Sequence, residues 1–281
     1  MTNVESAEKV MTKKVITCTS TDTLLQVQQL MVNNNISRVV IVDENKPVGI
    51  ITRRDVINFL VADKSKRGIE EIKAEEVMTK KLITAKRKTP ISNIAETMAK
   101  KDISSVIIVD GKGKLGGIVT KSDITAWYGA VKGAYKVQEF MTAKPVTVKP
   151  SQSVFLVASL MAEHAISRVI VVADKENKPA GIITEADMTM MSKLLKPAKV
   201  LKEGKPLVVR GAIALPKSVH LLTARDIMTS DLLTIRKSAD LADAAELMTK
   251  HKISGLPVTD KGKLVGIITK SDIIRAVAHE K

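Results

Sequence analysis

The stretch GIITRRD at Gly49–Asp55 recurs three more times in this chain of 281 residues. The other copies are GIVTKSD at Gly117–Asp123, GIITEAD at Gly181–Asp187 and GIITKSD at Gly266–Asp272. In each copy a glycine precedes two β-branched residues, which favours a short buried strand. A threonine then ends the strand, and an aspartate follows three residues later. This T-x-x-D motif occupies the N-cap and N3 positions of a capping box, so each copy predicts a strand that runs directly into a helix.

The residues upstream of each copy also recur in a fixed order. Every repeat opens with Met-Thr, and the methionine lies 38, 39, 40 or 38 residues before the glycine. A β-branched segment, an amphipathic helix, an Ile-Ser pair, an apolar strand and a polar turn follow. In repeat four, Leu241, Ala244, Ala245 and Met248 fall on one helical face. The predicted order of elements is β-α-β-β-α, four times over.

Each repeat resembles a CBS domain (the cystathionine β-synthase motif) in its opening Met-Thr, its Ile-Ser pair and its closing T-x-x-D motif. The resemblance extends from about residue 7 to residue 279. It implies an α/β fold of four CBS domains, paired as two Bateman modules (repeats one and two, three and four) that join into a flat disc. The gamma subunit of AMP-activated protein kinase and archaeal stand-alone CBS proteins are similar. Pairing also agrees with physics, because each three-stranded sheet would leave one face uncovered.

The expected domains are residues 7–63, 74–132, 137–194 and 224–281, with a basic linker or insert at 195–223. In CBS domains the T-x-x-D aspartate holds the ribose, the hydroxyl residue contacts ribose or phosphate, and adenine enters an apolar slot beside the first strand. The resemblance therefore implies nucleotide-binding residues in every repeat: Thr17, Arg38, Thr52, Asp55, Thr120, Asp123, Arg168, Thr184, Asp187, Thr269 and Asp272. The same threonines and aspartates also suffice as helix caps, and this purely structural interpretation stays open.

The repeats differ in the charge around this motif. Arg38 and Arg168 follow the Ile-Ser pair in repeats one and three, and arginine suits bidentate contact with phosphate. Arg53 adds a cation within the motif of repeat one, whereas Glu185 adds an acid to that of repeat three. Repeat one is therefore the best candidate site, and repeat three the weakest.

The chain carries a net charge of +15, which is compatible with polyanionic partners and equally with a lysine-rich surface that is merely solvated. The junction between repeats three and four is long and basic. Its candidate polyanion-binding residues are Lys193, Lys196, Lys199, Lys202, Lys205 and Arg210, and the alternative is a plain linker. Because the chain has only six aromatic residues, phosphate contacts on folded RNA are expected rather than base stacking.

Several protein classes are excluded by what the sequence lacks. It has no Walker A or G-x-S-x-G motif, no metal-ligand spacing among its four histidines, and no apolar run near the ~18 residues that span a bilayer. One cysteine, Cys18, and an N-terminus unlike a secretory signal favour a cytoplasmic location. We expect no catalysis, no metal and no membrane insertion.

The leading prediction is a regulatory protein that binds AMP, ADP or ATP, with no obligatory cofactor, and modulates an unknown partner. It would act as a monomeric disc or a homodimer. One alternative is an RNA- or ribosome-binding protein that uses CBS domains as a scaffold. Another is a regulatory subunit of a separately encoded enzyme or transporter.

Overall fold

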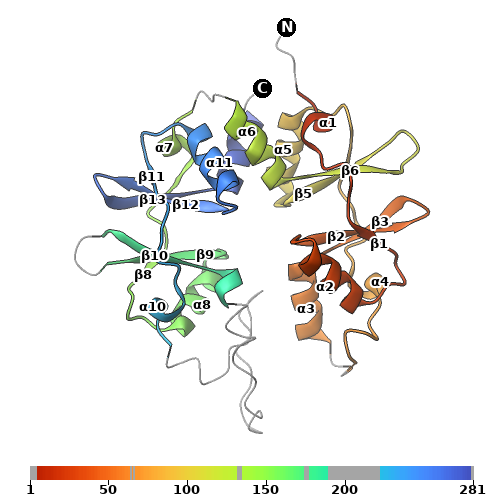
Figure 1. Cartoon of the computed structure of the whole chain (residues 1–281), viewed down its shortest axis with the longest axis horizontal. Helices are drawn as coiled ribbons and strands as arrows, with labels where there is room; N and C mark the ends of the chain where they lie inside the picture. Colours follow the sequence, from red (N-terminus) through yellow and green to blue (C-terminus); the bar gives the residue numbers. More distant parts are fainter. Residues whose placement is uncertain are drawn as a thin grey trace. The chain divides into compact units, whose positions relative to one another are not determined.

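The computed structural model describes residues 5–63, 65, 67–131, 135–173, 177–188 and 222–279 (Figure 1). Residues 1–133 with 270–281 form one compact unit, and residues 134–269 form a second. The predicted polyanion-binding residues lie outside the described residues: Lys193, Lys196, Lys199, Lys202, Lys205 and Arg210.

The first compact unit contains repeats one and two. Repeat one consists of α1 (Ala7–Val10), β1 (Thr17–Cys18), α2 (Leu24–Asn33), β2 (Arg38–Asp43), β3 (Lys46–Thr52) and α3 (Arg53–Ala62). Repeat two consists of α4 (Ala74–Val77), β4 (Thr84–Lys86), α5 (Ile91–Lys101), β5 (Ser105–Val109), β6 (Leu115–Thr120) and α6 (Lys121–Ala130).

The second compact unit contains repeat three and most of repeat four. Repeat three consists of α7 (Val137–Phe140), β7 (Thr142–Ala143), β8 (Thr147–Val148), α8 (Val154–Glu163), β9 (Arg168–Val172) and β10 (Pro179–Thr184), followed by helical residues 185–188. Repeat four consists of α10 (Ala224–Ile227), β11 (Ile235–Arg236), α11 (Leu241–Lys250), β12 (Gly255–Asp260), β13 (Lys263–Thr269) and α12 (Lys270–His279). The predicted order β-α-β-β-α is confirmed, with a short helix added before each Met-Thr.

Each repeat builds a small sheet in which the middle strand pairs in parallel with the first strand and antiparallel with the last. In Figure 1, α2 and α3 lie on one side of the sheet β1-β2-β3, and the strands of repeat two lie on its other side. Val40, Ile107 and Ile118 form a buried cluster between the two sheets. The predicted pairing of repeats one and two through their open sheet faces is confirmed, and Ile170, Leu264 and Ile267 play the same part for repeats three and four.

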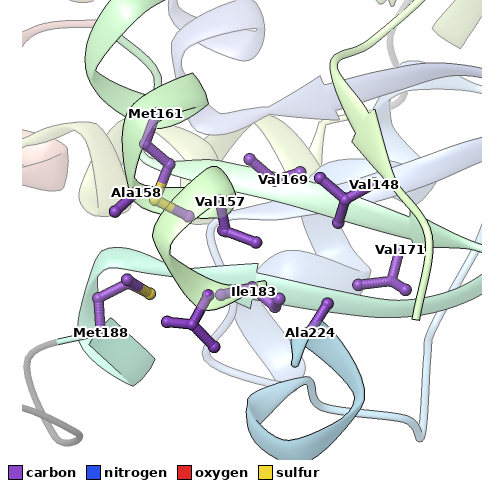
Figure 2. Packing of buried hydrophobic residues seen from close by; sticks show 10 residues of the cluster. Val148, Val157, Ala158, Met161, Val169, Val171, Ile183, Met188 and Ala224 are labelled. Atoms are coloured by element: carbon purple, nitrogen blue, oxygen red, sulfur yellow. The ribbon is translucent and has the colours of Figure 1, made fainter. Parts of the chain in front are cut away.

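The core of each repeat includes residues from its neighbour. Figure 2 shows Val157 and Met161 of α8 packed with Val169 and Ile183 of the sheet in repeat three. Ala224 of α10 lies in the same cluster, although it belongs to repeat four by sequence. Repeat one likewise includes Ile72 and Ala74 from the start of repeat two in its core. Each module is therefore closed by an exchange of opening segments.

The opening Met-Thr of each repeat adds to the last strand of its partner. Thr12 bridges Ile118 and Thr79 bridges Ile50 in the first module. In the second, β7 pairs with β13, and Thr229 bridges Ile182. The exchange is reciprocal, so the two repeats of a module are not independent folding units.

The glycine that leads each last strand makes room for the partner's methionine. A Cβ placed on Gly49 would lie 2.7 Å from Met78 Cγ, and one on Gly117 would lie 2.9 Å from Met11 Sδ. The second module has the same contacts, of Met141 with Gly266 and of Met228 with Gly181. The two most regular features of the sequence, Met-Thr and the glycine, therefore form one contact across the module interface.

Helix α12 continues from repeat four but packs in the first compact unit, against α5 and α6. Its residues Ile273, Ile274, Ala276 and Val277 are all buried. These positions form one apolar stripe at helical spacing, which explains why the helix docks along that side.

Candidate functional site

The T-x-x-D motifs form the predicted capping boxes. Thr52 caps α3 and Thr120 caps α6, and in both cases the aspartate accepts hydrogen bonds from the threonine N–H and hydroxyl. For Asp123 these bonds are 2.7 Å each, and both go to Oδ2. Asp187 accepts the equivalent pair from Thr184, also at 2.7 Å. Because one carboxylate oxygen makes both bonds, the Oδ1 of Asp123 remains an acceptor for a ligand hydroxyl.

Arg38 links the two repeats of the first module. Its guanidinium donates to the carbonyl oxygen of Ser104 at 2.7 Å and to the Ser37 hydroxyl at 3.0 Å. In the second module Arg168 donates to the carbonyl oxygen of Ser254, and a Cβ at Gly255 would collide with its Nη1. Arg168 thus occupies the space beside Gly255, the small residue that follows Ile-Ser in its partner repeat, and both arginines bind the serine carbonyl of the partner's Ile-Ser pair.

A cavity of 390 Å³ opens between repeats one and two. Its lining residues are Thr12, Lys14, Val15, Ile16, Asn34, Asn35, Ile36, Ser37, Arg38 and Val40 from repeat one, with Ile118, Thr120, Ser122 and Asp123 from repeat two. The volume lies in the usual range of about 300–1,000 Å³ for small-molecule sites. The lining includes apolar residues such as Val15, Ile16 and Ile118, together with Thr120 and Asp123 at the N-terminus of α6.

The cavity unites predicted residues that the sequence interpretation had placed in different sites. Arg38 was grouped with Thr52 and Asp55 of its own repeat, but it lines the cavity with Thr120 and Asp123 of repeat two. Thr17 lies in β1 opposite Val40 and is not a lining residue, whereas its neighbour Ile16 is. A site of this kind thus takes most of its apolar lining from one repeat and its T-x-x-D motif from the other.

The remaining predicted residues lie at equivalent positions outside this cavity. Thr52 and Asp55 start α3, Thr184 ends β10, and Arg168 starts β9. Thr269 ends β13, and Asp272 is 2% exposed and forms an ion pair with Arg275 at 2.6 Å. Sequence reasoning missed Lys14, Asn34, Asn35 and Ser122 as lining residues. In the sequence these residues are marked only by lying next to the Met-Thr pair, to the end of the first long helix of the repeat or within the T-x-x-D motif.

The charges in and beside the cavity interact. Burial raises the pKa of Asp123, while the hydrogen bonds from Thr120 and the charges of Arg38 and Lys270 oppose this rise. Burial lowers the pKa of Arg38, and Asp123 opposes that shift. Lys14 and Arg38 together outnumber the single carboxylate in the lining. The cavity can therefore accept hydroxyl groups at Asp123 and an anionic group at its cations.

A reciprocal contact joins the cavity to α12. Lys270 Nζ donates to the Ser122 hydroxyl at 3.0 Å, and Lys121 Nζ donates to the Ser271 hydroxyl at 3.0 Å. Burial lowers the pKa of Lys121, and the nearby charge of Arg38 acts in the same direction. Ser122 lines the cavity, so one hydrogen bond separates the lining from a cation on α12.

The described residues contain neither a metal-binding cluster nor a membrane-spanning helix. Three or more histidine, cysteine, aspartate or glutamate side chains do not gather anywhere there in a way that could hold a metal ion. Nor does the described part of the chain contain a helix long and apolar enough to cross a membrane.

Comparison with known proteins confirms the resemblance seen in the sequence. The family model described as "CBS domain" matches residues 7–62, 74–129, 137–192 and 224–279. Protein MJ1225 of Methanocaldococcus jannaschii is 27% identical over 95% of this chain and 96% of its own length. The crystal structure of that protein, proposed as an archaeal homolog of g-AMPK, superposes with a TM-score of 0.71 at 26% identity, over 96% of this chain and 99% of that one.

A second relative from the same organism is longer. Uncharacterized protein MJ1404 is 29% identical over 99% of this chain, which spans 63% of the length of MJ1404. A crystal structure of the CBS domain pair of protein MJ0100, in complex with 5-methylthioadenosine and S-adenosyl-L-methionine, is 34% identical. It covers 45% of this chain and 98% of that one, with a TM-score of 0.40.

Proposed function

Because the chain belongs to the CBS-domain family, we propose that it is a non-catalytic regulatory protein that binds an adenine nucleotide, AMP, ADP or ATP. The observation that carries this proposal is the cavity between repeats one and two. Its apolar residues Val15, Ile16 and Ile118 have the chemistry to cover an adenine ring. Asp123 and Thr120 offer acceptors and a hydroxyl to the ribose, at the start of a ten-residue helix.

In this proposal the phosphate groups of the bound nucleotide interact with the cationic side chains that line the cavity. Arg38 lines it, and helix N-termini favour anions through their free N–H groups and dipole. Lys14 adds a second cation to the lining. The corresponding T-x-x-D motifs at Thr52, Thr184 and Thr269 remain proposed sites of the same kind in the other repeats.

Ligand binding would be transmitted because the cavity walls come from two repeats. A bound nucleotide bridges repeat one to the N-terminus of α6, where Ser122 contacts Lys270 of α12. A ligand changes an equilibrium only by its difference in affinity for the two states. We therefore propose that nucleotides differing in phosphate number hold α6 and α12 differently, and that a partner senses this difference.

The test is isothermal titration calorimetry of the whole chain with adenosine, AMP, ADP and ATP. We expect micromolar or tighter binding of at least one nucleotide and weaker binding of adenosine, because adenosine has no phosphate group to interact with the cations of the cavity. Failure of every nucleotide to bind below millimolar concentration would refute the proposal. The titration tests nucleotide binding alone. The partner, whether an enzyme, a transporter or a ribosome, is identified by a separate experiment.

A further inference from the structure

The second compact unit carries a basic hollow of 370 Å³. Its lining residues are Arg236, Lys237, Ser238, Thr259, Asp260, Lys261 and Gly262, and we name this surface the repeat-four basic hollow. It lies where β11 ends beside β12, since Arg236 pairs with Thr259 in the sheet. The turn between β12 and β13 closes it, and exposed Lys263 follows that turn.

Positive charge exceeds negative charge in this hollow. Asp260 is the one acid of the lining and forms an ion pair with Lys237 at 2.7 Å. The Lys237 ammonium holds the pKa of Asp260 below its ordinary value, so this carboxylate is ionised at neutral pH and already engaged. Arg236 and Lys261 add two more cations without a second acid in the lining.

The fold does not require these cations, because repeat one has the same backbone without them. There the Ser20 hydroxyl donates to Asp43 at 3.1 Å, at the positions that Lys237 and Asp260 occupy in repeat four. Glu44 adopts φ 50° in the turn, as Lys261 does at φ 49°. An acidic and a basic residue thus adopt the same left-handed conformation, so the turn itself does not select lysine.

The same basic character recurs in repeat two. The equivalent exposed residues there lie at the end of β4, directly after it and in the turn before β6: Lys86, Arg87, Lys88, Lys112 and Lys114. Exposed cations therefore gather at this end of the sheet in both even-numbered repeats. Repeat three has exposed Lys149 at the position of Arg236, whereas repeat one has Thr19 there.

We propose that the repeat-four basic hollow binds the phosphate backbone of a nucleic-acid duplex. Arginine and lysine beside a serine hydroxyl suit phosphate oxygens. The lining contains no aromatic side chain, which rules out base stacking there and leaves backbone contact as the mode of binding.

An anionic membrane is a less suitable partner for this hollow. Membrane-surface binding usually combines cations with apolar side chains that enter the lipid. The large exposed hydrophobic residues of the described chain, Val32, Leu60 and Val131, belong to the first compact unit and not to the hollow. The lining itself is polar throughout.

The test compares two triple variants of the full chain by fluorescence anisotropy with a short labelled RNA duplex and a DNA duplex of the same sequence. The first variant combines Arg236→Gln, Lys237→Gln and Lys261→Gln. The matched control, Lys80→Gln, Lys81→Gln and Lys250→Gln, removes the same charge from exposed sites elsewhere. We expect the slope of log affinity against log salt to fall by about 2.7 for the hollow variant, from roughly 0.9 per lost phosphate contact, and to change little for the control.

Equal slopes for the two variants would overturn the proposal, as would absence of duplex binding by the parent protein at low salt. Binding to phosphatidylserine vesicles that depends on the hollow, without duplex binding, would overturn it in favour of a membrane. Preference between the two duplexes distinguishes RNA from DNA as the source of the phosphates. Both variants should keep the nucleotide affinity of the parent, because none of the six residues lines the cavity.

Discussion

Gly49→Ala tests the exchange of opening segments between paired repeats. The added Cβ would lie 2.7 Å from Cγ and 2.9 Å from Cβ of Met78. The thioether end of methionine can rotate away, but its Cβ is fixed to the backbone, so the opening segment of repeat two must shift. Overpacking of this kind costs about 1–3 kcal/mol of unfolding free energy. The control is Gly111→Ala, where an added Cβ meets nothing within 4 Å and the expected change is within about 0.5 kcal/mol.

The assay is urea unfolding followed by fluorescence of Trp127, the single tryptophan, which lies in α6 of the first compact unit. The double variant Gly49→Ala with Met78→Ala should be more stable than the sum of the single effects predicts, because Met78→Ala removes the Cγ that lies 2.7 Å from the added Cβ, although the contact with the Met78 Cβ position remains. Coupling between contacting residues is typically about 0.5–3 kcal/mol. Additive effects, or a Gly49→Ala variant as stable as Gly111→Ala, would refute the assigned contact.

Three further predictions follow from single residues. Arg38→Ala should reduce affinity for ATP more than affinity for adenosine in calorimetry, and equal losses would make Arg38 purely structural. Nucleotide affinity should fall in acid as Asp123 takes up a proton, at a pH above that of an ordinary aspartate because burial raises its pKa; titrations across pH should lose this dependence in Asp123→Asn. Burial raises the pKa of the Cys18 thiol to about 12, so a thiol reagent near pH 8 should label the folded protein far more slowly than the urea-unfolded protein.

The local pattern of apolar and capping residues was sufficient to predict the helices and strands of this fold. Ile50 and Ile51 before Thr52 specify a strand that ends in a capped helix, and the structure has both. The face of Leu241, Ala244, Ala245 and Met248 is fully buried, as the helical spacing predicts. These features depend on neighbours within a few positions of the chain, and for this reason the sequence reveals them.

Contacts between distant residues could not be predicted in the same way. Met11 recurs because it packs on Gly117, more than a hundred residues later, and no local spacing relates the two. Arg38 was expected to act with Asp55 because they share a repeat, yet the fold brings it to Asp123. Only the packing of two repeats face to face determines which arginine meets which aspartate.

The central claim is that Asp123 holds the ribose in a cavity built from two repeats, and calorimetric titration of AMP into Asp123→Asn and Asp55→Asn tests it most directly. The two aspartates cap equivalent helices, and both substitutions keep an oxygen for the cap. Only Asp123 lines the cavity, and a charged hydrogen bond is worth about 1.5–3 kcal/mol. We predict roughly tenfold or greater loss of affinity at that site for Asp123→Asn and almost none for Asp55→Asn. Equal losses, or a larger loss for Asp55→Asn, would contradict the account.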